Sequence, residues 1–326
     1  MEYPQARRTD FSEVLHGIEV ADPYRWMEDI DCDETKAWVD AQNELTQNYL
    51  SQIPQREAIK ARMTELWNYE KFGAPYRKGG RIFYSHNDGL QNQNVLFWQK
   101  SLEDEPKVLI DPNTLSEDGT VALSAVVISS DGKKMVYSVS ESGSDWVEWH
   151  VRDVDSGKDL PDVIKWSKFS GASWTKDNAG FFYAAYDEPK SEEAFKMSNL
   201  NQKLYYHKLG TPQGEDRLIY KNDDEPKWGF WGEVSDDGKY LVVYIRQGTL
   251  RKVNITLISL AKPDAAPIDL MTGFQAIYDY VGNDDDTCYF FTDDDAPMNR
   301  VIAVDLNNPA RENWQTVIAE QAQTLQ

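Results

Sequence analysis

The chain has 326 residues, of which 40% are hydrophobic and 12% aromatic, the composition of a folded globular protein. Its formal net charge is −21, from 34 basic and 55 acidic residues. Such a surface repels phosphate backbones and anionic lipid, so nucleic acid and membrane partners are not expected. The 11 Trp and 17 Tyr residues favour strands over helix bundles.

The two cysteines, Cys32 and Cys288, lie far apart and belong to no CxxC or Cys/His cluster. This pattern predicts no disulfide framework and favours a reducing compartment. The N-terminal sequence MEYPQARRTDFSEVL lacks the apolar run of a signal peptide, and no stretch approaches the ~18 apolar residues of a membrane span. We therefore expect a cytoplasmic protein.

Residues 1 to about 70 predict two amphipathic helices. Asp33–Thr35 offers N-cap chemistry for a helix that ends near Leu50, and a second helix is expected from about Gln55 to Trp67. The apolar residues at helical spacing are Trp38, Leu45 and Tyr49 in the first helix and Ile59, Met63, Leu66 and Trp67 in the second. Two such helices make no core alone, so this segment must pack against something else.

From about Tyr76 a β pattern repeats along the chain. Its clearest unit is Val126–Gly157, in which an apolar run leads into the turn Asp131-Gly132 and then into alternating strands. Similar turns occur at Gly79-Gly80, Asp177-Asn178, Asp237-Gly238 and Asp285-Asp286. From positions 79, 131, 177, 237 and 285, the turns are 46 to 60 residues apart. A period near 50 residues with several strands per unit is typical of a β-propeller.

We therefore predict a mainly β protein, with a helical segment at residues 1–70 and a propeller of about five four-stranded blades at residues 71–326. The third blade contains a polar excursion at residues 187–201. A propeller must close its ring or leave two faces exposed. Either the five blades close, or the chain is the front part of a larger ring. Residues 319–326 show no strand pattern that could close the ring, which favours the second alternative.

The sequence contains no complete catalytic constellation. A nucleophile elbow requires Gly-x-Ser-x-Gly, which does not occur; Ser144 follows Gly143, but we expect it in a polar loop. None of the four histidines has a partner at metal-ligand spacing. His150 and His207 lie in β runs, where a hydrogen-bonded strand histidine is the expected role, although a general base among the histidines stays open.

Three acidic triplets, centred on Asp224, Asp285 and Asp294, lack the alternating ligands, glycine and closing glutamate of a Ca²⁺ loop. We expect them to be solvated turns. No glycine-rich phosphate loop follows a strand. The sequence thus predicts neither a metal nor another cofactor.

Six stretches of the chain resemble the prolyl oligopeptidases, a family of serine peptidases (S9). They are Asp22–Asp29 (DPYRWMED), Gly89–Gln93 (GLQNQ), Leu109–Asn113 (LIDPN), Ser142–Trp146 (SGSDW), Gln202–His207 (QKLYYH) and Asp224–Trp228 (DEPKW). The likeness covers essentially all 326 residues in order, and no single motif carries it.

The resemblance implies an N-terminal helical segment, a seven-bladed propeller and a C-terminal α/β-hydrolase domain against which the helical segment packs. It also implies cleavage of short peptides after proline, with the propeller gating access and helping to bind the substrate. The Ser/Asp/His triad of the family lies in the hydrolase domain, so these 326 residues would be inactive alone and about two blades short of closure. The expected partners are proline-containing short peptides and the hydrolase domain. The alternative is a stand-alone propeller that binds proteins or peptides as a scaffold.

The resemblance assigns substrate binding to three residues. Phe169 matches an aromatic residue of a substrate subsite, and Arg246 matches an arginine that faces the central cavity. Asp145 matches an acid that pairs with the substrate-binding arginine of the hydrolase domain. On the residues alone, Phe169 fits a blade core equally well, Arg246 fits a surface charge and Asp145 fits a loop.

Two positions depart from the family pattern in the same outer subsite as Phe169. Gly229 stands where family members can carry methionine, and Thr249 stands where they can carry cysteine. The resemblance therefore does not carry over the shape or the preference of this subsite. Phe230 or Trp231 would supply replacement apolar surface there.

Overall fold

The computed structural model describes residues 2–189, 198–262 and 264–325. The chain divides into two compact units, Met1–Tyr69 and Glu70–Gln326. The core of the expected polar excursion, residues 190–197, lies outside the described residues. Within the described residues, no helix is long and apolar enough to cross a membrane.

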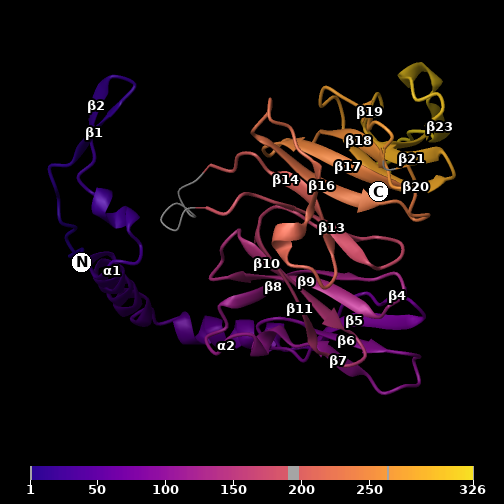
Figure 1. The fold of residues 1–326 in the computed structure, drawn as a ribbon. Helices are drawn as coiled ribbons and strands as arrows, with labels where there is room; N and C mark the ends of the chain where they lie inside the picture. Colours follow the sequence, from indigo (N-terminus) through magenta and orange to yellow (C-terminus); the bar gives the residue numbers. More distant parts are fainter. Residues whose placement is uncertain (1, 190–197, 263, 326) are drawn as a thin grey trace. The chain divides into compact units, whose positions relative to one another are not determined.

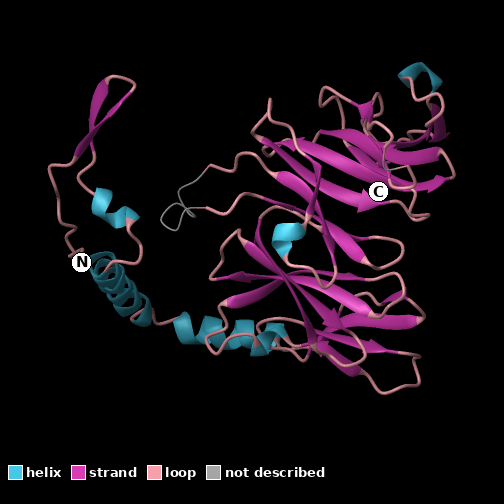
Figure 2. Cartoon of the chain, in the orientation of Figure 1, coloured by secondary structure: helices cyan, strands magenta, loops and turns pink. Residues whose placement is uncertain are grey.

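The first unit contains both α-helices that the sequence predicts (Figure 2). Strands β1 (Ser12–Leu15) and β2 (Ile18–Ala21) form a hairpin, and the 3-10 turn η1 (Arg25–Glu28) precedes helices α1 (Asp33–Ser51) and α2 (Arg56–Trp67). The expected N-cap at Asp33–Thr35 was wrong by one residue. Cys32 caps α1, because its Sγ accepts the Thr35 N–H at 3.4 Å.

The second unit consists of five antiparallel sheets, which follow one another in chain order (Figure 1). Blade 1 contains β3 (Lys71–Phe72), β4 (Tyr76–Lys78), β5 (Arg81–Asn87), β6 (Val95–Gln99) and β7 (Lys107–Ile110), and blade 2 contains β8 (Val121–Ile128), β9 (Lys134–Glu141), β10 (Val147–Asp153) and β11 (Asp159–Ser167). Blade 3 contains β12 (Ala172–Trp174), β13 (Gly180–Ala185), β14 (Lys203–Lys208) and β15 (Arg217–Tyr220), and blade 4 contains β16 (Trp228–Val234), β17 (Tyr240–Gln247), β18 (Val253–Ser259) and β19 (Ile268–Met271). Blade 5 contains β20 (Tyr278–Asp284), β21 (Thr287–Thr292), β22 (Arg300–Asp305) and β23 (Gln315–Ile318).

These sheets confirm the predicted mainly β propeller of four-stranded blades. In blades 2 to 5 each strand pairs with the next along the chain, so the strands are ordered as they are in the sequence. Blade 1 has a divided first strand, because β3 and β4 pair with opposite ends of β5. The Gly73 N–H still donates to the Ser85 carbonyl of β5 at 2.8 Å, and the ladder is interrupted at Ala74-Pro75, where proline has no N–H to donate.

Four buried hydrophobic clusters hold consecutive blades together. Trp98 of blade 1 shares a cluster with Met135 of blade 2. The next three clusters join blades 2 and 3, blades 3 and 4, and blades 4 and 5; their members include Trp149 with Phe181, Leu204 with Phe230, and Ile255 with Phe290. Each cluster draws on both faces of the junction, and none of these four joins blade 5 to blade 1.

The five predicted hairpin turns lead into β5, β9, β13, β17 and β21, one in each blade. Each turn contains at least one residue with a left-handed backbone: φ is 54° at Gly79 and 76° at Gly80, 71° at Gly132, 55° at Asn178, 78° at Gly238 and 49° at Asp285. Gly and Asn adopt this region most readily, which explains their recurrence at these positions. The repeated turn signal in the sequence therefore has a direct backbone cause.

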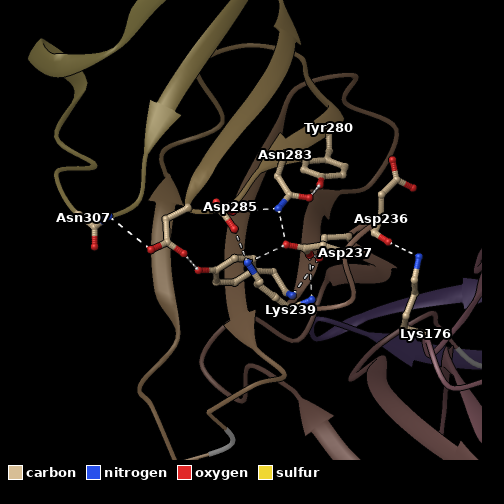
Figure 3. Close-up of polar contacts among 11 residues, drawn as sticks. Lys176, Asp236, Asp237, Lys239, Tyr280, Asn283, Asp285 and Asn307 are labelled. Carbon is tan, nitrogen blue, oxygen red and sulfur yellow. Dashed lines mark hydrogen bonds and ion pairs between the residues drawn. The ribbon is translucent and has the colours of Figure 1, made fainter.

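Neighbouring hairpin turns also touch one another. The Ser130 N–H donates to Asn178 Oδ1 at 2.9 Å, and Lys176 Nζ donates to the Asp236 carbonyl at 2.6 Å. Figure 3 shows the junction of blades 4 and 5, where Lys239 Nζ lies 2.7 Å from Asp285 Oδ1. The turns thus form a polar seam that runs from blade 2 to blade 5.

One acidic triplet differs from the expectation of solvated turns. Asp294 is only 6% exposed, and it accepts a hydrogen bond from Arg311 Nη2 at 2.7 Å. A carboxylate can be buried when a guanidinium compensates its lost hydration. Arg311 lies 17 residues further along the chain, beyond the reach of a local turn pattern.

Candidate functional site

A cavity of about 540 Å³ opens between blades 3 and 4. Its walls come from the β11–β12 loop, the residues after β13, strands β16 and β17, and the β17–β18 loop. The lining residues are Phe169, Tyr186, Asn199, Lys227, Gly229, Trp231, Arg246, Gly248, Thr249, Leu250, Arg251 and Val253. Two of the three predicted site residues, Phe169 and Arg246, therefore meet in one cavity.

Phe169 is held in an unusual backbone conformation beside this cavity. Its φ is 53°, in the left-handed region that carries an energetic penalty for residues other than glycine, and its side chain is 44% exposed. Buried Gln202 fixes the loop, because its amide donates to the Lys168 carbonyl at 2.7 Å and accepts the Phe230 N–H at 2.6 Å. Ser170 Oγ accepts the Ala184 N–H at 2.8 Å. The surrounding hydrogen bonds thus direct Phe169 into the cavity and not into a blade core.

Arg246 lies between two aromatic rings of the cavity. Its guanidinium carbon is 5.8 Å from the ring centroids of both Phe169 and Trp231, and Nη2 donates to the Phe169 carbonyl. Trp231 in turn stacks on Tyr244, with ring centroids 4.4 Å apart. Burial lowers the pKa of Arg246. Among the described residues, Arg246 forms no ion pair with a carboxylate.

The residues that depart from the family pattern line the same cavity. Gly229, Thr249 and Trp231 are all part of its wall. Phe230 points the other way and is buried in the core between blades 3 and 4. Of the two aromatic residues considered as replacement surface, Trp231 therefore provides it and Phe230 does not.

Asp145 lies outside this cavity. It is exposed in the loop between β9 and β10, and the structure gives it no hydrogen bond or ion pair with another described residue. Trp146 beside it packs edge-on against Trp166 and Tyr186, with centroids 5.8 and 5.9 Å away. Lys168 Nζ lies 4.2 Å from the Trp146 ring centroid. Asp145 is therefore an exposed carboxylate whose loop is held in place by the packing of Trp146.

Sequence reasoning missed two residues that shape the site. Gln202 fixes the loop that carries Phe169, and Tyr186 lines the cavity. Gln202 stands among polar residues at the start of a strand, and Tyr186 follows one, so nothing local distinguishes either from an ordinary strand end.

The two strand histidines, His150 and His207, both lie beside carboxylates. His207 is fully buried on β14; its Nδ1 lies 2.7 Å from Asp216 Oδ1 and its Nε2 lies 3.0 Å from Asp162 Oδ1. His150 Nε2 lies 3.1 Å from Glu148 Oε1. The contacts of His207 confirm the predicted hydrogen-bonded strand histidine there. Within the described residues, no group of three or more His, Cys, Asp or Glu side chains could hold a metal ion.

Comparison with known proteins places this architecture in a family. The family model described as prolyl oligopeptidase, N-terminal beta-propeller domain, matches residues 3–326. A prolyl endopeptidase of Elizabethkingia meningoseptica is 40% identical over 326 residues, which are 100% of this chain and 46% of that protein. Prolyl oligopeptidase A of Galerina marginata is 36% identical over 342 residues, covering 93% of this chain and 46% of the relative.

Solved structures give the same result. A structure from a study of two prolyl endopeptidases superposes with a TM-score of 0.85 at 34% identity. The match covers 98% of this chain and 47% of the chain in that structure. Prolyl oligopeptidase B of Galerina marginata was solved with a 35-residue hydrolysis and macrocyclization substrate and superposes with a TM-score of 0.82 at 31% identity. The match covers 98% of this chain and 48% of that protein. The chain spans about half the length of the curated relatives it matches. It belongs to the prolyl oligopeptidase family, as the N-terminal propeller region.

Proposed function

We propose that these residues are the propeller part of a serine endopeptidase that cleaves short peptides after proline. The observation that carries the proposal is the match, over the whole of this chain and 46% of the relative, to a prolyl endopeptidase at 40% identity. The cavity between blades 3 and 4 adds chemical support, because it offers aromatic rings and a guanidinium to a peptide. We propose a cytoplasmic location.

In the proposed enzyme, a serine attacks the carbonyl of the prolyl residue, with histidine as base and aspartate as the group that orients it. The hydrolase domain supplies this triad. The propeller restricts access to it and binds the flanking peptide, with Phe169 and Trp231 as apolar walls and Arg246 as a hydrogen-bond donor. Asp145, an exposed carboxylate, pairs with the arginine of the hydrolase domain.

The first test is turnover of a chromogenic Gly-Pro-p-nitroanilide substrate by the 326-residue chain. We expect none, because the sequence offers no nucleophile elbow to attack the prolyl carbonyl. Turnover that persists through repurification contradicts this expectation.

Peptide binding provides the second test, by calorimetric titration with a blocked Gln-Gly-Pro amide. Phe169→Ala removes an aromatic wall and should weaken binding about tenfold. Ser156→Ala, in a surface turn of blade 2, serves as a control that leaves binding unchanged. If the proline-free analogue Gln-Gly-Ala binds as tightly, the data favour a general binding scaffold over a part of a post-proline peptidase.

A further inference from the structure

We propose that Gly229 and Arg246 form a carboxylate-binding subsite in the cavity between blades 3 and 4. The glycine leaves the space in which the guanidinium lies, and the guanidinium selects peptides that present a carboxylate there. This inference rests on the proposed function, since its ligand is the peptide that the propeller binds. It adds a charge preference that the aromatic walls alone do not give.

The space over Gly229 is filled by the side chain of its cross-strand partner. Gly229 of β16 lies directly opposite Arg246 of β17 in the sheet register. A Cβ atom added at Gly229 would lie 2.9 Å from Arg246 Nε and 3.3 Å from Arg246 Cγ. It would also lie 3.0 Å from Gln202 Oε1. Any side chain at this position would therefore push the guanidinium out of its present place.

The backbone itself does not require glycine at this position. Gly229 does not have a left-handed φ, and it lies within a regular antiparallel ladder. The missing side chain therefore matters through the volume it leaves and not through backbone conformation. This separates Gly229 from the turn glycines, which are needed for their left-handed φ.

The cavity is cationic although the chain is strongly anionic. Lys227, Arg246 and Arg251 line it, and no carboxylate is present among its described lining residues, against a net charge of −21 for the chain. Arg251 has Asp279 within electrostatic reach. Arg246 is half-buried and has no such counter-charge among the described residues, so an incoming anion would compensate its lost hydration.

The geometry around Arg246 fits a carboxylate on a short aliphatic stem. Nη2 contacts the Phe169 carbonyl, which leaves donors on the planar guanidinium for a paired contact with two carboxylate oxygens. The rings of Phe169 and Trp231 stand on either side and can cover the stem methylenes. A glutamate side chain offers this combination, and a peptide C-terminus offers the same carboxylate without the stem.

Three blocked peptides test the subsite by calorimetric titration of the 326-residue chain at pH 7 and low salt. They are acetyl-Glu-Gly-Pro-amide, acetyl-Gln-Gly-Pro-amide and acetyl-Gln-Gly-Pro with a free carboxylate. A charge-assisted hydrogen bond should make the Glu peptide bind about tenfold more tightly than the Gln peptide. Tighter binding of the third peptide than of the Glu peptide would instead identify the C-terminus as the source of the carboxylate and overturn the glutamate assignment.

Variants separate the two residues. Gly229→Ala should abolish the Glu-over-Gln preference, because the added Cβ displaces the guanidinium that meets the carboxylate. Arg246→Gln should abolish the same preference without adding a side chain to β16. Gly171→Ala is the matched control, because its added Cβ meets no atom within 4 Å, its φ is not left-handed, and the residue lies two positions after Phe169. Unchanged melting temperatures show that the variants are folded.

The outcomes distinguish the two proposals. Equal binding of the Glu and Gln peptides by the unmodified chain overturns the subsite and leaves the proposed function standing. A preference that survives in Gly229→Ala overturns the role of the glycine. Failure of all three peptides to bind overturns the subsite together with the peptide-binding role of the propeller.

Discussion

At the scale of single residues, His207 is a fully buried side chain held between two carboxylates. Both of its ring nitrogens face carboxylate oxygens, of Asp216 and of Asp162, and carboxylates only accept hydrogen bonds. Both nitrogens must therefore donate, which makes the imidazole positively charged. Burial alone would lower the pKa of His207, but the hydrogen bonds to Asp216 and Asp162 outweigh burial and raise the pKa.

This arrangement predicts a stability that depends on pH. Because the folded-state pKa lies above that of the unfolded chain, the stabilisation is complete below about pH 6.5 and is lost as pH rises through the raised value. His207→Gln should lower the free energy of unfolding by about 3 kcal/mol at pH 6. Urea unfolding of both proteins at pH 6 and pH 9 measures the difference, which should shrink at the higher pH. A constant difference contradicts the charged state.

The same scale shows how far sequence could locate the site. The family resemblance pointed to Phe169 and Arg246, and the structure brings them to one cavity. Their contact depends on the left-handed φ of Phe169 and on a glycine across the sheet, which are properties of the assembled blades. Asp145 faces solvent, and its assignment stays a prediction.

At the scale of elements, the hairpin turns fix the spacing between blades. A Cβ added at Gly79 would lie 1.9 Å from the Asp131 carbonyl oxygen of the next blade, whereas one added at Gly80 would meet nothing within 4 Å. Both residues have positive φ, 54° and 76°. Both glycines therefore need a left-handed backbone, but only Gly79 is packed against the next blade.

This pair permits a controlled measurement of interblade packing. Gly80→Ala should lower the free energy of unfolding by about 1 kcal/mol, from the left-handed φ alone. Gly79→Ala should lower it by about 3 kcal/mol, because the clash with blade 2 adds to the same penalty. Denaturant unfolding measures both values. If the two substitutions lower the free energy of unfolding equally, the turns of blades 1 and 2 are not in close contact.

The turn of blade 4 carries the acidic centre of the junction in Figure 3. Burial alone would raise the pKa of Asp237, but hydrogen bonds from the Lys239 N–H, Ser235 Oγ and Asn283 Nδ2 lower it to about 2. The stabilisation is therefore present above about pH 4 and is lost as pH falls toward 2. Asp237→Asn should be less stable than the parent at pH 7, and the difference should fade on acid titration, followed by tryptophan fluorescence.

Sequence patterns located most strands, but they did not show the divided pairing in blade 1 or the residue that caps α1. The recurring hairpin turns between alternating runs, built from Asp, Gly and Asn, are local signals with a local backbone cause, so the blades could be counted from them. The divided first strand of blade 1 was not predicted, since Lys71–Phe72 is too short to show alternation. The cap at Cys32 was missed because sulfur is a weak acceptor and cysteine is an uncommon N-cap.

At the scale of the whole chain, none of the four buried hydrophobic clusters lies in the first unit. The apolar side chains of α1 and α2 are not buried; Thr35 is the buried residue of the two helices in the described structure. Helices of 19 and 12 residues without a core are marginal in water. That the hydrolase domain covers them stays a prediction of the family resemblance.

A comparison of fragments checks whether the first unit folds alone. A peptide of residues 1–69 should show weak, non-cooperative helicity by circular dichroism. Residues 70–326, which contain the four buried clusters, should unfold cooperatively. A cooperative helical transition in the shorter fragment would show that the helices stabilise each other without a partner.

The four clusters also determine the order in which the molecule can assemble. Each joins a blade to the one that follows it in the chain, so each junction is complete once the next 50 or so residues have been made. A nascent chain can therefore add blades one after another as it leaves the ribosome, with one unmatched hydrophobic face at the growing end. The order of synthesis would then set the order of folding. A ribosomal pause after a complete blade would expose less apolar surface of the nascent chain than a pause in the middle of a blade.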